Sequence, residues 1–132
     1  MYVFDTSSCV TLLRGRSPKL RDRALRQRLD EIATSTLVVA ELRYGAAKSS
    51  NPESEGRKVD ELLAFFLILP FDYAAANDYG PLRAKLERAG KSIGGMDTLL
   101  AAHALSLSAT IVTENVREFR RVPGLLVEDW TK

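Results

Sequence analysis

The first eight residues constrain the fold more than any other stretch of the sequence. Tyr2–Phe4 favour β-structure without alternating with polar residues, which indicates a strand covered on both faces, as in a parallel sheet under helices. Asp5 follows directly, and each residue of Thr6–Ser8 can cap a helix. Asp5 is therefore predicted at the carboxyl end of a buried strand, the edge at which open α/β sheets bind ligands. A helix cap alone would also explain an isolated Asp here, so its interpretation depends on the other acids.

Strand-like and helix-like segments alternate along the chain and predict a three-layer α/β/α sandwich with a mainly parallel central sheet. The expected strands cover residues 2–4, 32–35, 67–71, 110–113 and 125–127, and the expected helices begin near residues 7, 18, 36, 53, 72 and 96. A length of 132 residues suits a single domain with one core, and no repeat or linker divides residues 1–132.

Two of these helices carry apolar residues at helical spacing and are expected to turn them toward the core. The residues are Leu20, Ala24, Leu25 and Leu29 in the helix opened by Pro18, and Val39, Leu42 and Ala46 in the helix from about 36 to 48. Residues 67–71 form a compact apolar strand. The helix from 96 to 107 is apolar nearly all round, which is typical of a buried helix, yet Asp97 lies in its first turn.

Composition excludes several classes of protein. The apolar fraction of 45% is that of a globular chain, and no apolar run approaches the roughly 18 residues of a membrane span. The N-terminus lacks the basic-then-apolar pattern of a secretion signal. The single Cys9 excludes an internal disulfide and a Cys-rich metal site, which fits a cytoplasmic location. A dinucleotide enzyme is excluded because no Gly-rich turn follows the first strand.

The net charge of +2 is unevenly distributed. Between Arg14 and Arg28 there are seven basic residues and only one acidic residue, Asp22. A second basic group, Arg117 with Arg120 and Arg121, follows the fourth strand. Such groups can contact a polyanion, and they can equally be solvated helix faces.

Three carboxylates recur in similar settings. Asp5 ends the first strand, Glu41 lies in the first turns of the third helix, and Asp97 opens the most apolar helix. In a parallel sheet the strand ends and helix starts gather at one edge, so these acids can converge there. Converging carboxylates raise one another's pKa unless a cation lies between them, and oxygen ligands of this kind suit Mg²⁺. Each acid also has a purely structural explanation, as a cap, a solvated side chain or a helix-dipole partner.

The segment after the fourth strand offers further oxygen ligands at the same edge. Glu114, Asn115 and Glu118 are the candidates, and the sequence does not choose between them. His103 is the only histidine, and its place among Ala and Leu in mid-helix favours a core or interface role over catalysis.

Four segments in this order resemble the motifs of PIN domains, and the closing stretch resembles that of VapC-type toxins. The segments are Phe4-Asp5-Thr6, Val39–Ala46, Ile93–Ala104 and Val112–Phe119, with Val122–Leu125 and Glu128–Trp130 behind them. The resemblance runs from Met1 to Trp130. It implies a Mg²⁺-dependent endoribonuclease, with Mn²⁺ able to substitute, that is the toxin of a bacterial type II toxin–antitoxin pair. A VapB-type antitoxin would be its partner, a structured RNA such as tRNA or rRNA its substrate, and a homodimer its assembly.

Carried over by motif position, Asp5, Glu41 and Asp97 become the acidic site residues, with Asp5 and Asp97 the metal ligands. The candidates for the fourth ligand or a supporting contact are Asn115, Glu118, Glu114 and Thr6. The charge distribution, and not the motifs, makes Arg14, Arg16, Arg117 and Arg121 the candidates for holding the RNA backbone. Two positions depart from the family pattern. Ser7 stands where Asn is usual, and Asn115 stands where Asp is frequent, which leaves Glu118 as a possible substitute.

Two alternatives from other classes remain at this point. A catalytically silent partner-binding module would tolerate Ser7 and Asn115 at the site. A phosphoacceptor signalling domain would share the sheet and the acidic edge, but Asp5 has no acidic neighbour and no matching Lys follows Val112.

Overall fold

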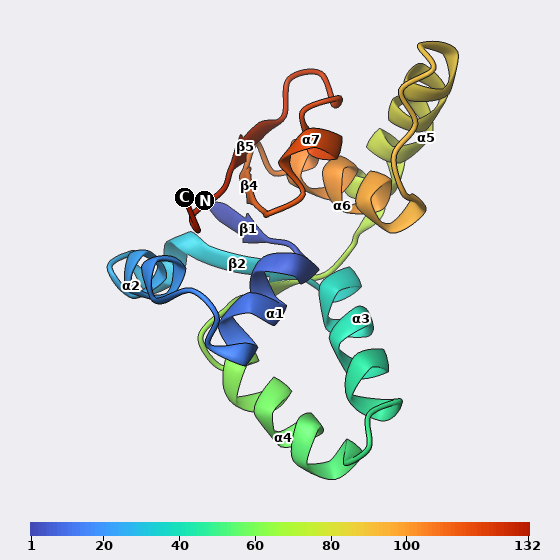
Figure 1. Ribbon diagram of the computed structural model, residues 1–132. Coiled ribbons are helices and arrows are strands. Elements are labelled where there is room, and N and C mark those ends of the chain that lie inside the picture. Colours follow the sequence, from blue (N-terminus) through green and yellow to red (C-terminus); the bar gives the residue numbers. More distant parts are fainter.

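The computed structural model describes residues 1–132 as a five-stranded sheet flanked by seven α-helices (Figure 1). The strands are β1 (Tyr2–Phe4), β2 (Ile32–Ser35), β3 (Leu67–Leu69), β4 (Thr110–Val112) and β5 (Leu126–Glu128). The helices are α1 (Thr6–Arg14), α2 (Pro18–Leu25), α3 (Thr36–Ala47), α4 (Pro52–Leu63), α5 (Tyr73–Arg88), α6 (Gly95–Ser106) and α7 (Val116–Phe119), with a 3₁₀ turn η1 (Leu29–Glu31) before β2. In Figure 1, α1, α3 and α4 lie below the sheet, α2 lies to its left beside β2, and α5 to α7 lie toward the upper right. The predicted α/β sandwich is confirmed.

All strand pairs in the sheet are parallel, and their order is β3-β2-β1-β4-β5. The first strand is therefore the central one, and Phe4 pairs with Thr34 on one side and Val112 on the other. The chain adds β2 and β3 on one side of β1 and then crosses to add β4 and β5 on the other. The carboxyl ends of β1 and β4 thus flank the point at which the strand order reverses, which is where open α/β sheets bind ligands.

Side chains at strand ends start the helices, as the sequence pattern predicts. Asp5 caps α1 by accepting a hydrogen bond from the Ser8 N–H, and Ser35 caps α3 by accepting one from the Leu37 N–H. Because each of these residues ends a neighbouring parallel strand, α1 and α3 begin at the same edge of the sheet. Gly15 ends α1 with φ of 65°, a conformation that glycine adopts without strain.

The core joins the start of the chain to residues near its end. Trp130 is buried and packs edge-to-face on Phe4, with ring centroids 5.3 Å apart, and on Tyr2 at 4.8 Å. Arg23 of α2 covers the same indole, 4.4 Å from the ring centre, and its guanidinium lies 2.8 Å from Glu128. One arginine of the predicted basic stretch therefore holds the fold together and is not free to bind a polyanion.

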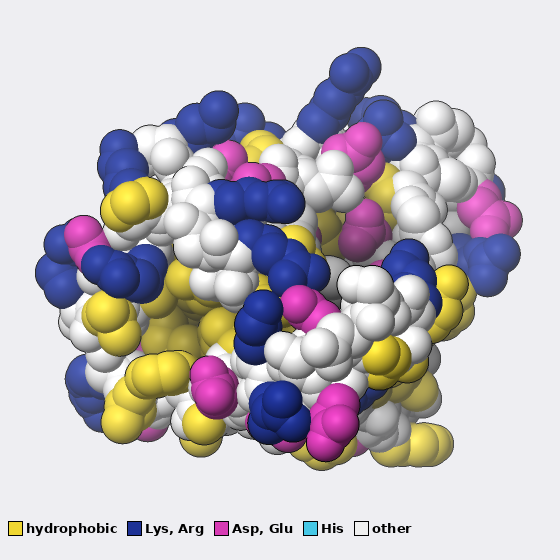
Figure 2. Space-filling model, turned by 60° about the horizontal axis from the view of Figure 1, so that its bottom comes forward, with side chains coloured by type: hydrophobic (Ala, Val, Ile, Leu, Met, Phe, Trp, Pro, Cys, Tyr) yellow, Lys and Arg dark blue, Asp and Glu magenta, His cyan; other side chains and the backbone are white.

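Three expectations about burial are wrong. In α2 only Leu20 is buried, whereas Leu25 and Leu29 are 63% and 74% exposed, because the helix ends at Leu25 and the chain turns away through η1. These two side chains and Phe65 line an open apolar groove of about 320 Å³, visible as a hydrophobic hollow in Figure 2. In α3 it is Val38, not Val39, that is buried.

The third strand is also less buried than its apolar sequence suggests. Leu67 and Ile68 are 42% and 40% exposed, because β3 is an edge strand with a single neighbour. No helix combines the length and apolar character that crossing a membrane requires.

Candidate functional site

The starts of α1, α3 and α6 and the end of β4 meet at one edge of the sheet (Figure 1). This arrangement brings the three predicted acids into one electrostatic environment. The negative charges of Asp5, Glu41 and Glu118 all raise the pKa of Asp97, after the larger effect of its burial. Side chains that lie between 21 and 92 residues from Asp97 in sequence therefore act on its carboxylate.

Asp5 is buried, with 4% of its surface exposed, and both of its carboxylate oxygens are hydrogen-bonded. Oδ1 accepts from the Ser8 N–H at 2.9 Å and from the Ser7 hydroxyl at 2.7 Å, and Oδ2 accepts from the Thr113 hydroxyl at 2.5 Å. Burial raises the pKa of Asp5, and these three hydrogen bonds oppose that shift. The carboxylate is thus held in one orientation across the gap between β1 and β4.

Glu41 projects from the second turn of α3 toward the start of α1. Its Oε1 accepts a hydrogen bond from the hydroxyl of Thr6, the first residue of α1. The contact joins the two helix starts and leaves the second carboxylate oxygen of Glu41 without a hydrogen bond from the protein. Thr6, predicted as a possible supporting residue, lies directly against one of the acids.

Asp97 lies in the first turn of α6 and is half-buried. Its Oδ2 accepts a hydrogen bond from the side-chain amide of Asn115 at 2.9 Å. A single amide offsets only part of the repulsion from the neighbouring acids, so the pKa of Asp97 stays raised. This is the behaviour expected of a carboxylate placed where a cation would bind.

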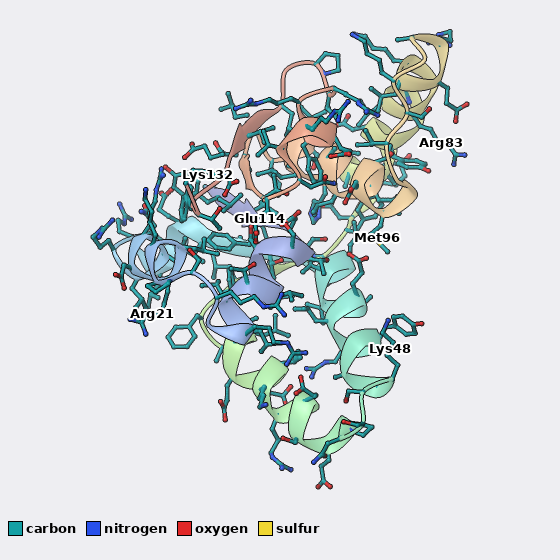
Figure 3. The ribbon with its side chains drawn as sticks, viewed as in Figure 1. Arg21, Lys48, Arg83, Met96, Glu114 and Lys132 are labelled. Atoms are coloured by element: carbon teal, nitrogen blue, oxygen red, sulfur yellow. The ribbon has the colours of Figure 1, made fainter.

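The structure separates the alternatives for the fourth ligand. Asn115 contacts Asp97 directly, and Glu118, one turn further on in α7, lies close enough to raise the pKa of Asp97. Glu114 is different: it is exposed, and its carboxylate accepts a hydrogen bond from the Thr11 hydroxyl on α1. Figure 3 shows Glu114 above the start of α1 and Met96 at the start of α6.

The residue that sequence reasoning missed is Thr113. It is fully buried directly after β4, and its hydroxyl both donates to Asp5 and accepts from the backbone N–H of Asn115. The signal was its position, because Thr113 follows β4 as Asp5 follows β1, and these strands are neighbours only in the folded sheet.

The donor set fits a hard divalent cation, since Asp5, Glu41, Asp97 and Asn115 offer only oxygen ligands and the charge between them is uncompensated. No three acidic, histidine or cysteine side chains stand close enough together to hold one ion in the present arrangement. In this arrangement Thr6 binds Glu41 and Asn115 binds Asp97. The predicted acids therefore lie at a shared edge of the sheet, but they do not form a complete set of metal ligands.

The predicted basic residues fall into two groups. Arg14 and Arg16 lie at or beyond the end of the nine-residue α1, about 13 Å along the helix from Asp5, and Arg14 pairs with Glu55 at 2.9 Å. Arg117 is exposed on α7, two residues after Asn115, and Arg121 donates to the Ser92 carbonyl in the loop before α6. The second group lies on or just after α7, the helix that also carries Glu118, whereas α1 runs away from the edge at which it starts.

A sequence model of one known family matches residues 2–125, almost the whole chain, and its description is the PIN domain. The chain belongs to the PIN domain family. Ribonuclease VapC2 of Rickettsia felis is 38% identical over 133 residues, which cover 100% of this chain and 99% of that protein. The tRNA(fMet)-specific endonuclease VapC of Salmonella typhimurium is 34% identical over 129 residues, covering 98% and 97%.

Solved structures give the same relationship. DNA-bound VapBC from Salmonella typhimurium contains a chain that matches this PIN domain with a TM-score of 0.93 at 34% identity, over 98% of this chain and 97% of that one. VapBC2 from Rickettsia felis, bound to a promoter DNA fragment, gives 0.90 at 36% identity over 98% of both chains. The resemblance read from four sequence motifs is thus confirmed for the family and the fold.

Proposed function

We propose that this PIN domain is a Mg²⁺-dependent endoribonuclease and the toxin of a type II toxin–antitoxin pair. The observation that carries the proposal is that Asp5, Glu41 and Asp97 lie at one edge of the sheet, where the strand order reverses. The negative charges of Asp5, Glu41 and Glu118 there raise the pKa of Asp97, which supports it. Family membership and the ribonuclease names of the similar proteins support the reaction class.

Asp5 and Asp97 would hold the cation, with Glu41 and Asn115 beside it. A bound Mg²⁺ would lower the pKa of a water molecule and offset charge on the attacked phosphate. Glu41, fixed by Thr6, would accept a proton or a hydrogen bond from the attacking water through its free oxygen. Thr113 and Ser7 would keep the Asp5 carboxylate in place during the reaction.

Recognition of the substrate would depend on charge and shape. Arg117 would contact phosphates next to the acids, so binding should weaken with salt. No aromatic residues are interleaved with the basic ones to stack bases, which favours a structured RNA such as a tRNA over a linear sequence. A VapB-type antitoxin is the proposed protein partner, by extension from the VapBC structures. A homodimer is proposed from the family resemblance alone.

The test is RNA cleavage by Asp97→Asn and Asp5→Asn. Each change removes one negative charge at nearly constant shape, so the fold should persist while cleavage falls by about 100-fold or more, because loss of metal binding costs several kcal/mol of transition-state stabilisation. Cleavage is measured on total tRNA in Mg²⁺ and in EDTA, and folding by circular dichroism.

Asp78→Asn is the matched control, because Asp78 is an exposed acid on α5 away from the edge. Full cleavage by either site variant would refute the assignment of that residue, and cleavage that persists in EDTA would refute the metal. A protein that binds no Mn²⁺ by calorimetry and cuts no RNA would instead be the catalytically silent partner-binding module.

A further inference from the structure

The one histidine of the chain lies at a junction of three segments behind the acidic edge. His103 is 1% exposed in the middle of α6. Its Nδ1 lies 2.9 Å from the Ser35 hydroxyl, at the end of β2. Its ring also meets Phe71 edge-to-face at 5.6 Å, in the connection between β3 and α5.

The side-chain hydroxyl of Ser35 joins His103 to the start of α3. Ser35 Oγ lies 2.9 Å from His103 Nδ1, and which of the two donates the hydrogen bond depends on the tautomer of the ring. Burial lowers the pKa of His103, and the Asp72 charge and the Pro70 carbonyl oppose that shift. Ser35 Oγ in turn accepts from the Leu37 N–H at 3.0 Å, which caps α3.

These bonds connect the two helices that carry the acids. Ser35 is the cap of α3, which bears Glu41, and His103 belongs to α6, which bears Asp97. Each end of the connection lies six residues from its acid, about 9 Å along the helix. A purely apolar contact would let the two helices slide, whereas a buried, fully paired hydrogen bond fixes their relative position.

We propose that His103 is a positioning residue, which sets the spacing between Glu41 and Asp97 through its hydrogen bond to the cap of α3. The proposal rests on the proposed nuclease function for its catalytic consequence. The alternative is a histidine that only fills and stabilises the core, and the experiment has to separate these two roles.

The test compares His103→Leu, which removes the polar atom, with His103→Asn, which keeps one near the position of Nδ1. Leu105→Ala is the control, because Leu105 is a partly buried apolar residue of the same helix and its truncation lowers stability without removing a hydrogen bond to α3. The measurements are kcat and KM for tRNA cleavage, Mn²⁺ affinity by calorimetry, the melting temperature, and the distance between the Cα atoms of Glu41 and Asp97 in crystal structures.

We expect His103→Leu to change the distance between Glu41 and Asp97, to weaken Mn²⁺ binding, and to lower kcat on the order of 10-fold or more at nearly constant KM, since small misplacements of catalytic groups are costly. His103→Asn should recover most of the kcat, and Leu105→Ala should lower only the melting temperature. A folded His103→Leu protein with unchanged distance and kcat would overturn the proposal, and so would equal losses of kcat in Leu105→Ala. If the unaltered protein cuts no RNA, the nuclease assignment fails, and the distance and the Mn²⁺ affinity alone decide the role of His103.

Discussion

Asp5 and Asp97 show how one residue type serves in two different ways at the same edge. Burial raises the pKa of both carboxyls, yet Asp5 accepts three hydrogen bonds and caps a helix, whereas Asp97 accepts one from Asn115 and faces three negative charges. Asp5 therefore contributes to the fold as well as to the site. Asp97 is the residue at which stability and the proposed function conflict.

The conflict predicts that Asp97→Asn stabilises the protein at neutral pH. Because the folded-state pKa of Asp97 is raised, its contribution favours folding below the ordinary aspartate pKa of about 3.9 and is lost as the pH rises through the folded-state value. At pH 7 the substitution should add on the order of 1 kcal/mol to the free energy of unfolding, the energy of a solvent-screened charge pair. Thermal unfolding at pH 7 and at about pH 3.5 measures the difference.

Asp5→Asn provides the comparison, because an amide cannot accept all three hydrogen bonds that Asp5 accepts, and no gain is expected. A stabilisation by Asp97→Asn that is the same at both pH values would show that charge repulsion is not its cause.

At the scale of single residues, the sequence predicts which residues belong to the candidate site better than it predicts their contacts with one another. Asp5 and Asp97 were predicted because their positions at a strand end and a helix start are visible locally. The Thr113 bond to Asp5 and the Ser35 contact with His103 join residues 108 and 68 positions apart, so they depend on which strands become neighbours. The order of the strands is a property of the whole sheet and cannot be predicted from any one segment.

Among the elements, α2 stabilises the fold, although its basic residues suggest a role in binding. Arg23 lies over the Trp130 indole and bonds Glu128, and so it fastens α2 to the last strand. Of the other arginines of the basic stretch, Arg21 pairs with Asp22 and Arg28 with Asp30. A run of basic residues in sequence is thus not a continuous basic surface.

Arg23→Ala should lower the free energy of unfolding by about 1–2 kcal/mol, because it removes a cation–π contact and a partly exposed ion pair. Urea unfolding gives the value, and cleavage by the folded protein should be unchanged. Arg26→Ala at the C-cap of the same helix, where Arg26 is exposed and makes no ion pair, should change the free energy by less than about 0.5 kcal/mol. Equal effects of the two substitutions would mean that the contact with Trp130 contributes nothing.

The strands and longer helices were all predicted within a few residues, because their apolar spacing and caps are local signals. The single turn α7 was missed, since four residues show no periodicity. The exposure of β3, Leu25 and Leu29 was missed for another reason: an apolar residue is buried only if another element covers it, and the spacing of one segment does not reveal its neighbours.

For the molecule as a whole, the distribution of unpaired charge predicts where RNA would bind. Figure 2 shows acidic side chains inside a hollow with Lys and Arg side chains on its borders. Arg117 lies on α7, next to Glu118 in sequence, and Arg16 lies beyond the far end of α1; both are exposed and neither makes an ion pair. Substitutions of these two arginines can therefore be compared to test on which side of the molecule RNA binds.

Arg117→Ala should weaken RNA binding and reduce the slope of log affinity against log salt by about 1, whereas Arg16→Ala should leave both unchanged. Fluorescence anisotropy of a labelled tRNA over a range of salt concentrations, with the catalytically impaired Asp97→Asn background, measures both quantities. A larger effect at Arg16 would place the RNA on the opposite side of the molecule and restore the basic stretch as its contact.

The central place of the first strand has a consequence for the timing of synthesis. A ribosome makes Asp5 among the first residues, but the hydroxyl that orients it and the strand beside it appear more than 100 residues later. The sheet around β1 therefore cannot be completed in step with translation from the N-terminus. In a nascent polypeptide the acids therefore stay unassembled until β4 and Thr113 have left the ribosomal exit tunnel.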